Sequence, residues 1–150
     1  MKKTIAIIIS VVSVMMANAK ESHDVFPFGV ISCIGIVESN LNPNAIGDNG
    51  EAVGALQIHK EYVDDVNRIL GYKAYTYDDR KDTTKSYMMA YVYLVHYGRR
   101  YKKLTGEDPT PVVYARIHNG GPNGWKKDAT IEYGKKFMSV YNASHTKSQK

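Results

Sequence analysis

The stretch FGVISCIGIVES at residues 28–39 decides the fold of this chain. It is apolar at nearly every position, its only internal breakers are two glycines, and it ends in one carboxylate, Glu38. Pro27, immediately before it, suits the first turn of a helix. The stretch therefore predicts a buried helix that ends near Asn40.

Cys33 lies inside this apolar run and is the only cysteine of the chain. A single cysteine excludes an internal disulfide. A nucleophilic cysteine would need a basic, partly exposed setting with a histidine partner, and no neighbour in the sequence supplies one. We expect Cys33 to be a buried thiol without a chemical role.

Outward from this stretch, a loop over residues 41–51 is rich in Asn and Gly, which tolerate positive φ. Apolar residues at helical spacing predict the remaining elements, and no strand pattern competes. The predicted helices cover residues 56–70, stopped by Gly71; residues 83–104, capped by Asp82 or Thr83 and stopped by Gly106; a short segment from Pro111 to the Asn119 turn; and residues 127–141, followed by a frayed tail. The predicted class is all-α.

The amino end has the anatomy of a secretory signal over residues 1–19. Two lysines precede an apolar run at residues 5–16, and Ala17 and Ala19 form an A-x-A exit. The run is shorter than the roughly 20 residues that a spanning helix needs. We therefore expect an exported protein, periplasmic or extracellular, without stable membrane insertion after signal cleavage. An uncleaved amino-terminal anchor is the alternative.

The mature chain, residues 20–150, is expected to form one compact monomeric domain with its core at about residues 28–142. The formal charge of the whole chain is +5, and the signal carries two lysines and no acid. The remaining lysines are spread along the chain, without the block of like charges that marks a nucleic-acid arm. We expect no nucleic-acid partner.

Glu38 is the unusual residue of the opening stretch, because it is a carboxylate among apolar neighbours. An apolar setting disfavours ionisation of a carboxyl group. A glutamic acid that stays protonated can donate a proton to a leaving glycosidic oxygen. Alone, this pattern does not separate a catalytic acid from a surface residue or a helix cap.

Three ordered motifs extend the pattern: ESNLNP at residues 38–43, GALQI at 54–58 and NGGP at 119–122. Together they resemble the lysozyme-like superfamily, in particular the catalytic domain of soluble lytic transglycosylases and their goose-type lysozyme relatives. The family pattern is E-S-x-x-x-P, then G-L-M-Q-I, then A-Y-N-x-G-P, and the likeness spans about residues 28–137. It implies a mainly helical member of the lysozyme-like α+β superfamily, a single domain with a catalytic cleft for peptidoglycan glycan strands.

The resemblance also implies roles for individual residues. Glu38 would be the general acid, Ser39 would orient the acid or the sugar, Gln57 would lie in the cleft, and Asn119 matches the Asn of the third motif. Amides suit sugars because each offers a donor and an acceptor. The structural alternatives are that Gln57 ties loop backbone and that Asn119 serves turn chemistry.

His118 departs from the family pattern, which usually has Tyr at this position. The sugar contact or proton positioning associated with that Tyr is therefore open, although imidazole can still hydrogen bond, and we include His118 among the substrate-binding residues. Neither His118 nor His59 has a metal-ligand partner nearby in the sequence. No phosphate-binding loop follows a strand, so we expect no metal and no cofactor.

The second carboxylate is undecided between Asp48 and Glu51. An inverting hydrolase holds its two carboxyl groups roughly 6.5 to 9.5 Å apart, and a retaining one about 5 to 5.5 Å. Goose-type lysozymes have a similar Gly-Asp ahead of their Gln motif, which favours Asp48, whereas acids in Gly- and Asn-rich loops are usually solvated turn formers.

The predicted activity is cleavage of the β-1,4 bond between N-acetylmuramic acid and N-acetylglucosamine. A lytic transglycosylase that leaves 1,6-anhydromuramoyl ends is the first hypothesis. The alternatives are a hydrolytic muramidase with Asp48 as the second acid, a wall-binding protein without activity, and a hydrolase of chitin or chitosan, since fold similarity does not fix the sugar.

Overall fold

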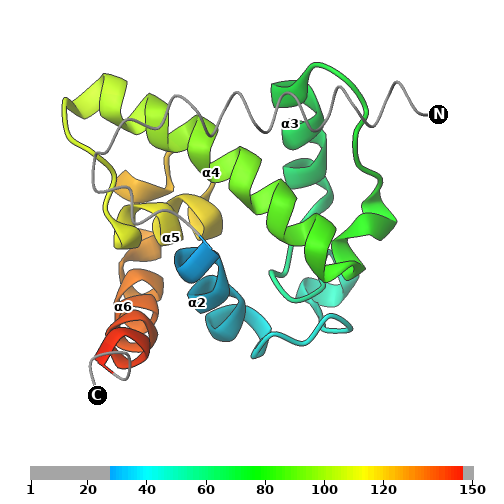
Figure 1. The fold of residues 1–150 in the computed structure, drawn as a ribbon, viewed down its shortest axis with the longest axis horizontal. Coiled ribbons are helices and arrows are strands. Elements are labelled where there is room, and N and C mark those ends of the chain that lie inside the picture. Colours follow the sequence, from blue (N-terminus) through cyan, green and yellow to red (C-terminus); the bar gives the residue numbers. More distant parts are fainter. Residues whose placement is uncertain (1–27, 147–150) are drawn as a thin grey trace.

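The computed structural model describes residues 28–146, and in this part of the chain five α-helices surround one apolar core (Figure 1). The signal predicted at residues 1–19 lies outside the described residues. The helices are α2 (Phe28–Ser39), α3 (Lys60–Leu70), α4 (Thr83–Thr105), α5 (Pro111–Gly120) and α6 (Ile131–Thr146). Short 3-10 helices are η1 (Asp48–Gly50), η2 (Tyr77–Lys81), η3 (Gly124–Lys126) and η4 (Asp128–Thr130), and two strands, β1 (Ile46–Gly47) and β2 (Ala52–Val53), form a hairpin.

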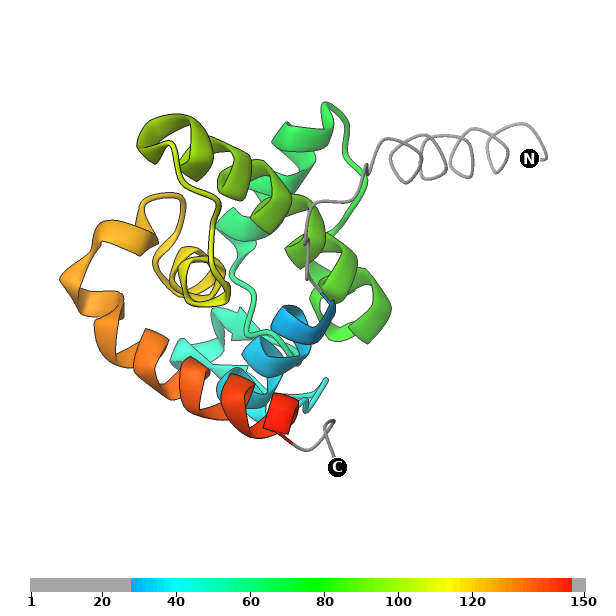
Figure 2. The same cartoon turned by 60° about the vertical axis from the view of Figure 1, so that its left-hand side comes forward.

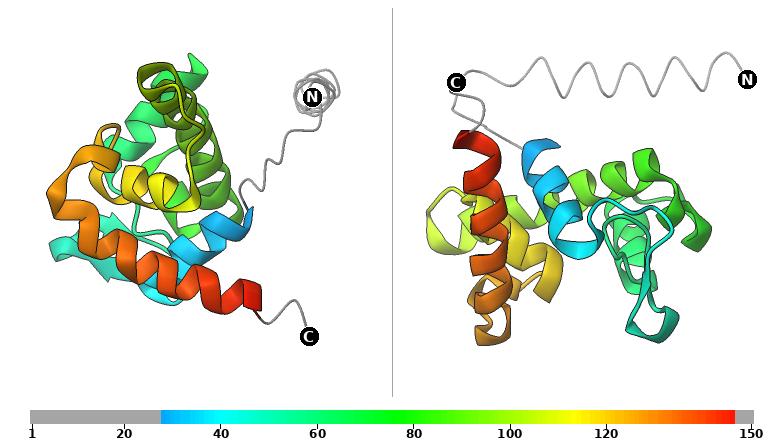
Figure 3. Two further views of the ribbon diagram at one scale, coloured as in Figure 1. Left: turned by 90° about the vertical axis from the view of Figure 1, so that its left-hand side faces the viewer. Right: turned by 90° about the horizontal axis from the view of Figure 1, so that it is seen from below.

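Helix α2 is the central helix, as its sequence predicts. A helix that is apolar on all sides is stable only when other elements cover it, and Val30, Ile31 and Ile34 are buried. Figures 1 and 3 show α2 between α6 and the β1–β2 hairpin. Cys33 is buried, as expected, and forms no disulfide.

Helices α3 and α4 pack against each other on the other side of the core. The structure confirms the predicted stop residues of both helices and the predicted start of α4. Gly71 and Gly106 both adopt φ of +79°, the left-handed conformation that ends a helix most easily at glycine. Asp82 caps α4 by accepting a hydrogen bond from the backbone N–H of Lys85.

Helices α5 and α6 pack on each other and on α2 (Figure 2). Pro111 occupies the first turn of α5, and Phe137 of α6 is fully buried. The last helix differs from its prediction at both ends. It begins at Ile131, because two 3-10 turns occupy residues 124–130, and it continues to Thr146 where a frayed tail was expected.

The hairpin corrects the expectation that the chain has no strands. Ile46 pairs with Val53 and Gly47 with Ala52 in an antiparallel ladder, and a bridge joins Val53 to Ile58. Strands of two residues are too short to show an alternating pattern in the sequence. This bridge and the turn before it also explain why α3 begins at Lys60 and not at residue 56.

The buried side chain of Arg80 fixes the hairpin to the segment before α4. It donates to the carbonyl oxygens of Glu51 (2.9 Å), Ile58 (3.1 Å) and Tyr77 (2.7 Å). Gly54 lets the backbone of Arg80 pack against the hairpin, because a Cβ at Gly54 would lie 2.0 Å from the carbonyl oxygen of Arg80. These hydrogen bonds hold the hairpin in a fixed position beside the segment before α4.

Within residues 28–146, none of the helices combines the length and the apolar character needed to cross a bilayer. The described residues form a single mainly helical domain with one small sheet, which confirms the predicted fold class.

Candidate functional site

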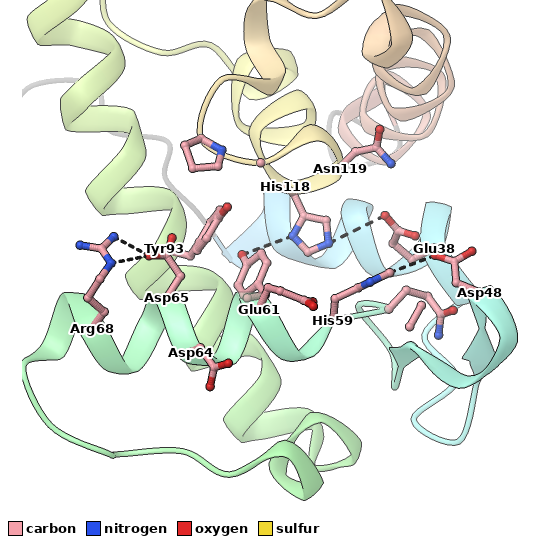
Figure 4. Close-up of a pocket in the computed structure, with 15 residues that line it drawn as sticks. Glu38, Asp48, His59, Glu61, Asp64, Asp65, Arg68, Tyr93, His118 and Asn119 are labelled. Atoms are coloured by element: carbon pink, nitrogen blue, oxygen red, sulfur yellow. Dashed lines mark hydrogen bonds and ion pairs between the residues drawn. The ribbon is translucent and has the colours of Figure 1, made fainter.

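A pocket of about 860 Å³ opens where the end of α2, the hairpin, α3 and the end of α5 meet (Figure 4). The family resemblance placed a cleft at the same motifs. The lining includes most of the predicted site residues, namely Glu38, Asp48, Gln57, His118 and Asn119. Residues far apart in the chain, such as Glu38 and Asn119, which are separated by 81 positions, thus contribute to one cavity.

Glu38 lies at the carboxyl end of α2, and its side chain is 17% exposed. Its Oε1 accepts a hydrogen bond of 2.7 Å from the phenol of Tyr133 on α6. Burial, followed by the charge of Glu38 and this hydrogen bond, raises the pKa of Tyr133. Tyr133 therefore keeps its proton at neutral pH and remains a donor to Glu38.

His118 approaches the same carboxylate oxygen from α5. Its Nε2 lies 3.8 Å from Oε1 of Glu38 and 3.0 Å from the carbonyl oxygen of Leu56. Burial lowers the pKa of His118, and this effect outweighs the opposing influence of the Glu38 charge and the Leu56 carbonyl. His118 is therefore a neutral imidazole at neutral pH.

Asp48 and His59 are hydrogen-bonded at the outer edge of the pocket, with Oδ2 and Nε2 separated by 2.9 Å. Both side chains are well exposed, at 70% and 43%. Figure 4 shows this pair on the same side of the pocket as Glu38. His59 and His118, which have no ligand partner nearby in the sequence, thus each meet a carboxylate in the folded chain. The other candidate, Glu51, is exposed and does not line the pocket.

Gln57 contributes to the pocket wall and also ties its own turn. Its Nε2 donates to the carbonyl oxygen of Gly54 at 2.9 Å, and its backbone has a positive φ of 48°. Gly47 leaves room for the side chain, because a Cβ there would lie 2.4 Å from Oε1 of Gln57. Gln57 therefore does both things considered for it: its side chain ties the backbone of its own turn, and it also lines the pocket.

Ser39 lies outside the lining of the pocket. Its hydroxyl donates to the carbonyl oxygen of Ala55 at 2.8 Å and accepts from the backbone N–H of Asn42 at 3.0 Å. Ser39 thereby joins the end of α2 to the turn that carries Gln57. Asn119, in contrast, is exposed at the pocket and has its amide available to a ligand.

Helix α3 supplies an acidic wall of the pocket, which the sequence analysis did not predict. Glu61, Asp64 and Asp65 line the pocket beside Arg68, which is paired with Asp65. In Figure 4 these residues extend away from Glu38, with His118 between the two ends. With Glu38 and Asp48, five carboxylates and one guanidinium face the cavity.

Unusual backbone conformations gather around the same pocket. In the part of the chain that the structure describes, all the non-glycine residues with positive φ fall in one segment: Asn40, Leu41, Asp48, Asn49 and Gln57. Such conformations cost of order 1 kcal/mol each and persist where the surroundings enforce them, which is frequent at functional sites. The less common backbone conformations of the described chain therefore lie in the segment that carries Asp48 and Gln57 into the pocket wall.

Tyr133 and Tyr62 are two further site residues that the sequence analysis did not identify. Tyr133 recurs at helical spacing with Phe137 and Tyr141, a pattern typical of core packing. Tyr62 lines the pocket and lies 3.4 Å from Nδ1 of His118. No group of three His, Cys, Asp or Glu side chains among residues 28–146 is arranged to hold a metal ion.

The pocket falls within a match to a known family. A family model described as the transglycosylase SLT domain matches residues 15–140, which include every residue of the pocket and Tyr133. No curated protein matches the chain. Among solved structures, a chain in the crystal structure of Aeromonas hydrophila PliI in complex with Meretrix lusoria lysozyme is similar, with a TM-score of 0.63 and 25% identity over 80% of this chain and 94% of that chain.

Proposed function

Because the chain belongs to the transglycosylase SLT domain family, we propose that it is an exported enzyme that cleaves the glycan strands of peptidoglycan, with Glu38 as its catalytic acid. The bond would be the β-1,4 link between N-acetylmuramic acid and N-acetylglucosamine. The observation that carries this proposal is the setting of Glu38, a largely enclosed carboxyl group at a pocket, with one oxygen held by Tyr133.

The first step is proton transfer from Glu38 to the glycosidic oxygen while the bond between that oxygen and C1 breaks. Positive charge develops on the sugar ring, and the substrate's own acetamido group stabilises it. The phenol of Tyr133 then donates to the carboxylate that Glu38 has become. A hydrogen bond that strengthens as this charge forms favours the transition state over the ground state.

The second step returns the proton to Glu38. The ionised carboxylate removes the proton of the C6 hydroxyl, whose oxygen forms the new bond to C1. The product is a 1,6-anhydro sugar, and no water is consumed. One protein carboxylate suffices for this sequence, which agrees with an Asp48 that is exposed and paired with His59.

Hydrolysis is the second candidate, since Asp48 lines the same pocket as Glu38. In that route, Asp48 would activate a water molecule on the opposite face of the sugar. The two routes share the first step and differ only in what completes the reaction.

The decisive experiment is turnover of purified peptidoglycan by the Glu38→Gln variant. Glutamine keeps the size of the side chain but cannot give up a proton, so we expect activity to fall by at least about 100-fold. Glu132→Gln is the matched control, because Glu132 is exposed and pairs with Lys135 outside the pocket. Circular dichroism would check that both variants fold. Activity retained in a folded Glu38→Gln variant would exclude the proposed role.

Mass spectrometry of the wild-type products separates the two routes. Transglycosylation leaves anhydro ends, whereas hydrolysis leaves reducing ends that carry oxygen from water labelled with ¹⁸O. A parallel assay on chitin oligomers tests the sugar specificity. No turnover of either polymer would indicate a wall-binding protein.

A further inference from the structure

Tyr62 of α3 and Glu38 of α2 contact opposite sides of the His118 ring. The phenol oxygen of Tyr62 lies 3.4 Å from Nδ1, and Nε2 lies 3.0 Å from the Leu56 carbonyl oxygen and 3.8 Å from Oε1 of Glu38. Tyr62 itself is held by Tyr93 of α4, whose ring is stacked on it with centroids 3.8 Å apart. His118 is therefore the link between Tyr62 and the proposed catalytic acid.

The contacts determine which nitrogen of His118 carries the proton. A carbonyl oxygen can only accept, so the short contact with Leu56 requires a hydrogen on Nε2. In a neutral imidazole, Nδ1 is then an acceptor. Burial, followed by neighbouring tyrosines and Asp65, raises the pKa of Tyr62 well above its ordinary value, so its phenol keeps its hydrogen and can donate it to Nδ1.

The other tautomer would interfere with catalysis. With the hydrogen on Nδ1, the lone pair of Nε2 would face both the Leu56 carbonyl oxygen and the carboxyl group of Glu38. It would then be able to accept the proton of Glu38, which the glycosidic oxygen needs. With the hydrogen on Nε2, no lone pair on His118 faces Glu38, and the N–H group that donates to the Leu56 carbonyl oxygen has its nitrogen 3.8 Å from the oxygen that becomes charged when Glu38 releases its proton.

We propose that Tyr62 is a positioning residue, which acts together with the Leu56 carbonyl oxygen to hold His118 in the neutral Nε2–H tautomer, so that the proton of Glu38 is directed to the substrate. The inference rests on the proposed role of Glu38 and adds to it a reason for a histidine at position 118. The titratable groups that face His118 are Glu38 from α2 and Tyr62 from α3, with Tyr93 behind Tyr62 and Tyr133 behind Glu38.

The tautomer can be measured on the wild-type protein without substrate. We expect ¹⁵N–¹H spectra of the histidine side chains at pH 7.5 to show a hydrogen on Nε2 of His118, with assignment by loss of the signal in His118→Gln. In Tyr62→Phe, where the Leu56 carbonyl alone favours a hydrogen on Nε2, the spectra should show a measurable fraction of the Nδ1–H tautomer beside the main Nε2–H form. A hydrogen on Nδ1 in the wild type overturns the proposal even if the Tyr62→Phe variant fails to fold.

Kinetics test whether this contact affects the reaction. Tyr62→Phe should lower kcat about tenfold with KM nearly unchanged, the size expected for one hydrogen bond. In a His118→Gln background, the same substitution should cause no further loss, because Tyr62 acts through His118. Tyr87→Phe is the matched control, since its hydroxyl contacts Ser32 away from the pocket.

Failure of this proposal is distinct from failure of the proposed function. An unchanged tautomer and unchanged kcat in Tyr62→Phe overturn the role of Tyr62, as does a loss that adds fully to that of His118→Gln. Both results leave the role of Glu38 intact. Activity retained by Glu38→Gln removes the proposed function, while the tautomer measurement still reports on the contact of Tyr62 with His118.

Discussion

The phenol of Tyr133 donates a hydrogen bond of 2.7 Å to Oε1 of Glu38, although the two residues lie 95 positions apart in the chain. The packing of α6 along α2 brings them together. Because Tyr133 has a raised pKa, it remains a donor whichever protonation state Glu38 adopts. The carboxyl group therefore has one fixed partner while its proton leaves and returns.

Tyr133→Phe should lower kcat by about 10- to 100-fold with little change in KM. The range corresponds to a hydrogen bond to a charged group, about 1.5 to 3 kcal/mol, which matters most when Glu38 is ionised. Initial rates on soluble muropeptide chains of defined length would give both constants. An increase in KM at constant kcat would assign Tyr133 to substrate binding and not to the support of Glu38.

Tyr141→Phe is the control for this substitution. Tyr141 lies two turns further along α6, and its ring stacks on Phe137 in the core, outside the pocket. The variant makes the same chemical change in the same helix and should retain wild-type kcat. An equal loss in both variants would point to a general disturbance of α6.

Asp48→Asn separates the two routes of the proposed reaction. If water completes the reaction with Asp48 as its base, the rate should fall by about 100-fold or more. If the C6 hydroxyl completes it, the rate should stay within about twofold, because loss of an exposed contact with His59 has little effect on stability. Asp108→Asn is the control, since Asp108 is an exposed carboxylate paired with Lys102 outside the pocket. We expect the rate to be retained in Asp48→Asn, together with anhydro products.

The helices were predictable from the sequence because their causes are local. The apolar run of α2, the Asp82 cap and the left-handed glycines at 71 and 106 each act within one or two turns. The β1–β2 hairpin was missed because strands of two residues carry no alternation. Its position depends instead on Arg80, whose hydrogen bonds reach Glu51 across 29 positions of the chain.

The candidate site was only partly predictable for the same reason. Glu38 stands out locally, as a carboxylate in an apolar helix. Its partners depend on how helices that are distant in the sequence pack together. Tyr133 has the sequence pattern of a core aromatic, and Tyr62 and His118 are in contact although they lie 56 positions apart. The acidic wall of α3 could not be predicted either, because it depends on which side of the helix faces the pocket.

Gly124→Ala should destabilise the fold by about 3 kcal/mol. A Cβ at Gly124 would lie 1.9 Å from the carbonyl oxygen of Arg116 and 2.8 Å from its carbonyl carbon, so η3 would have to move away from α5. Urea denaturation gives the free energy of unfolding. Gly29→Ala is the matched control, because nothing lies within 4 Å of its Cβ position and alanine favours the helix. Equal stability of the two variants would contradict the close contact.

His118 should make the fold less stable in weak acid. Burial gives the folded protein a lowered His118 pKa, so the unfolded chain, with an ordinary value of about 6.5, binds this proton more readily. The stabilisation is complete above about pH 6.5 and is lost as the pH falls from there through the folded pKa, at a rate of at most about 1.4 kcal/mol per pH unit. Between pH 7.5 and 5.0, His118→Gln should therefore lose less unfolding free energy than the wild type, whereas the exposed His96→Gln should follow the wild type. Parallel curves for the wild type and His118→Gln would show that His118 takes up its proton equally in both states.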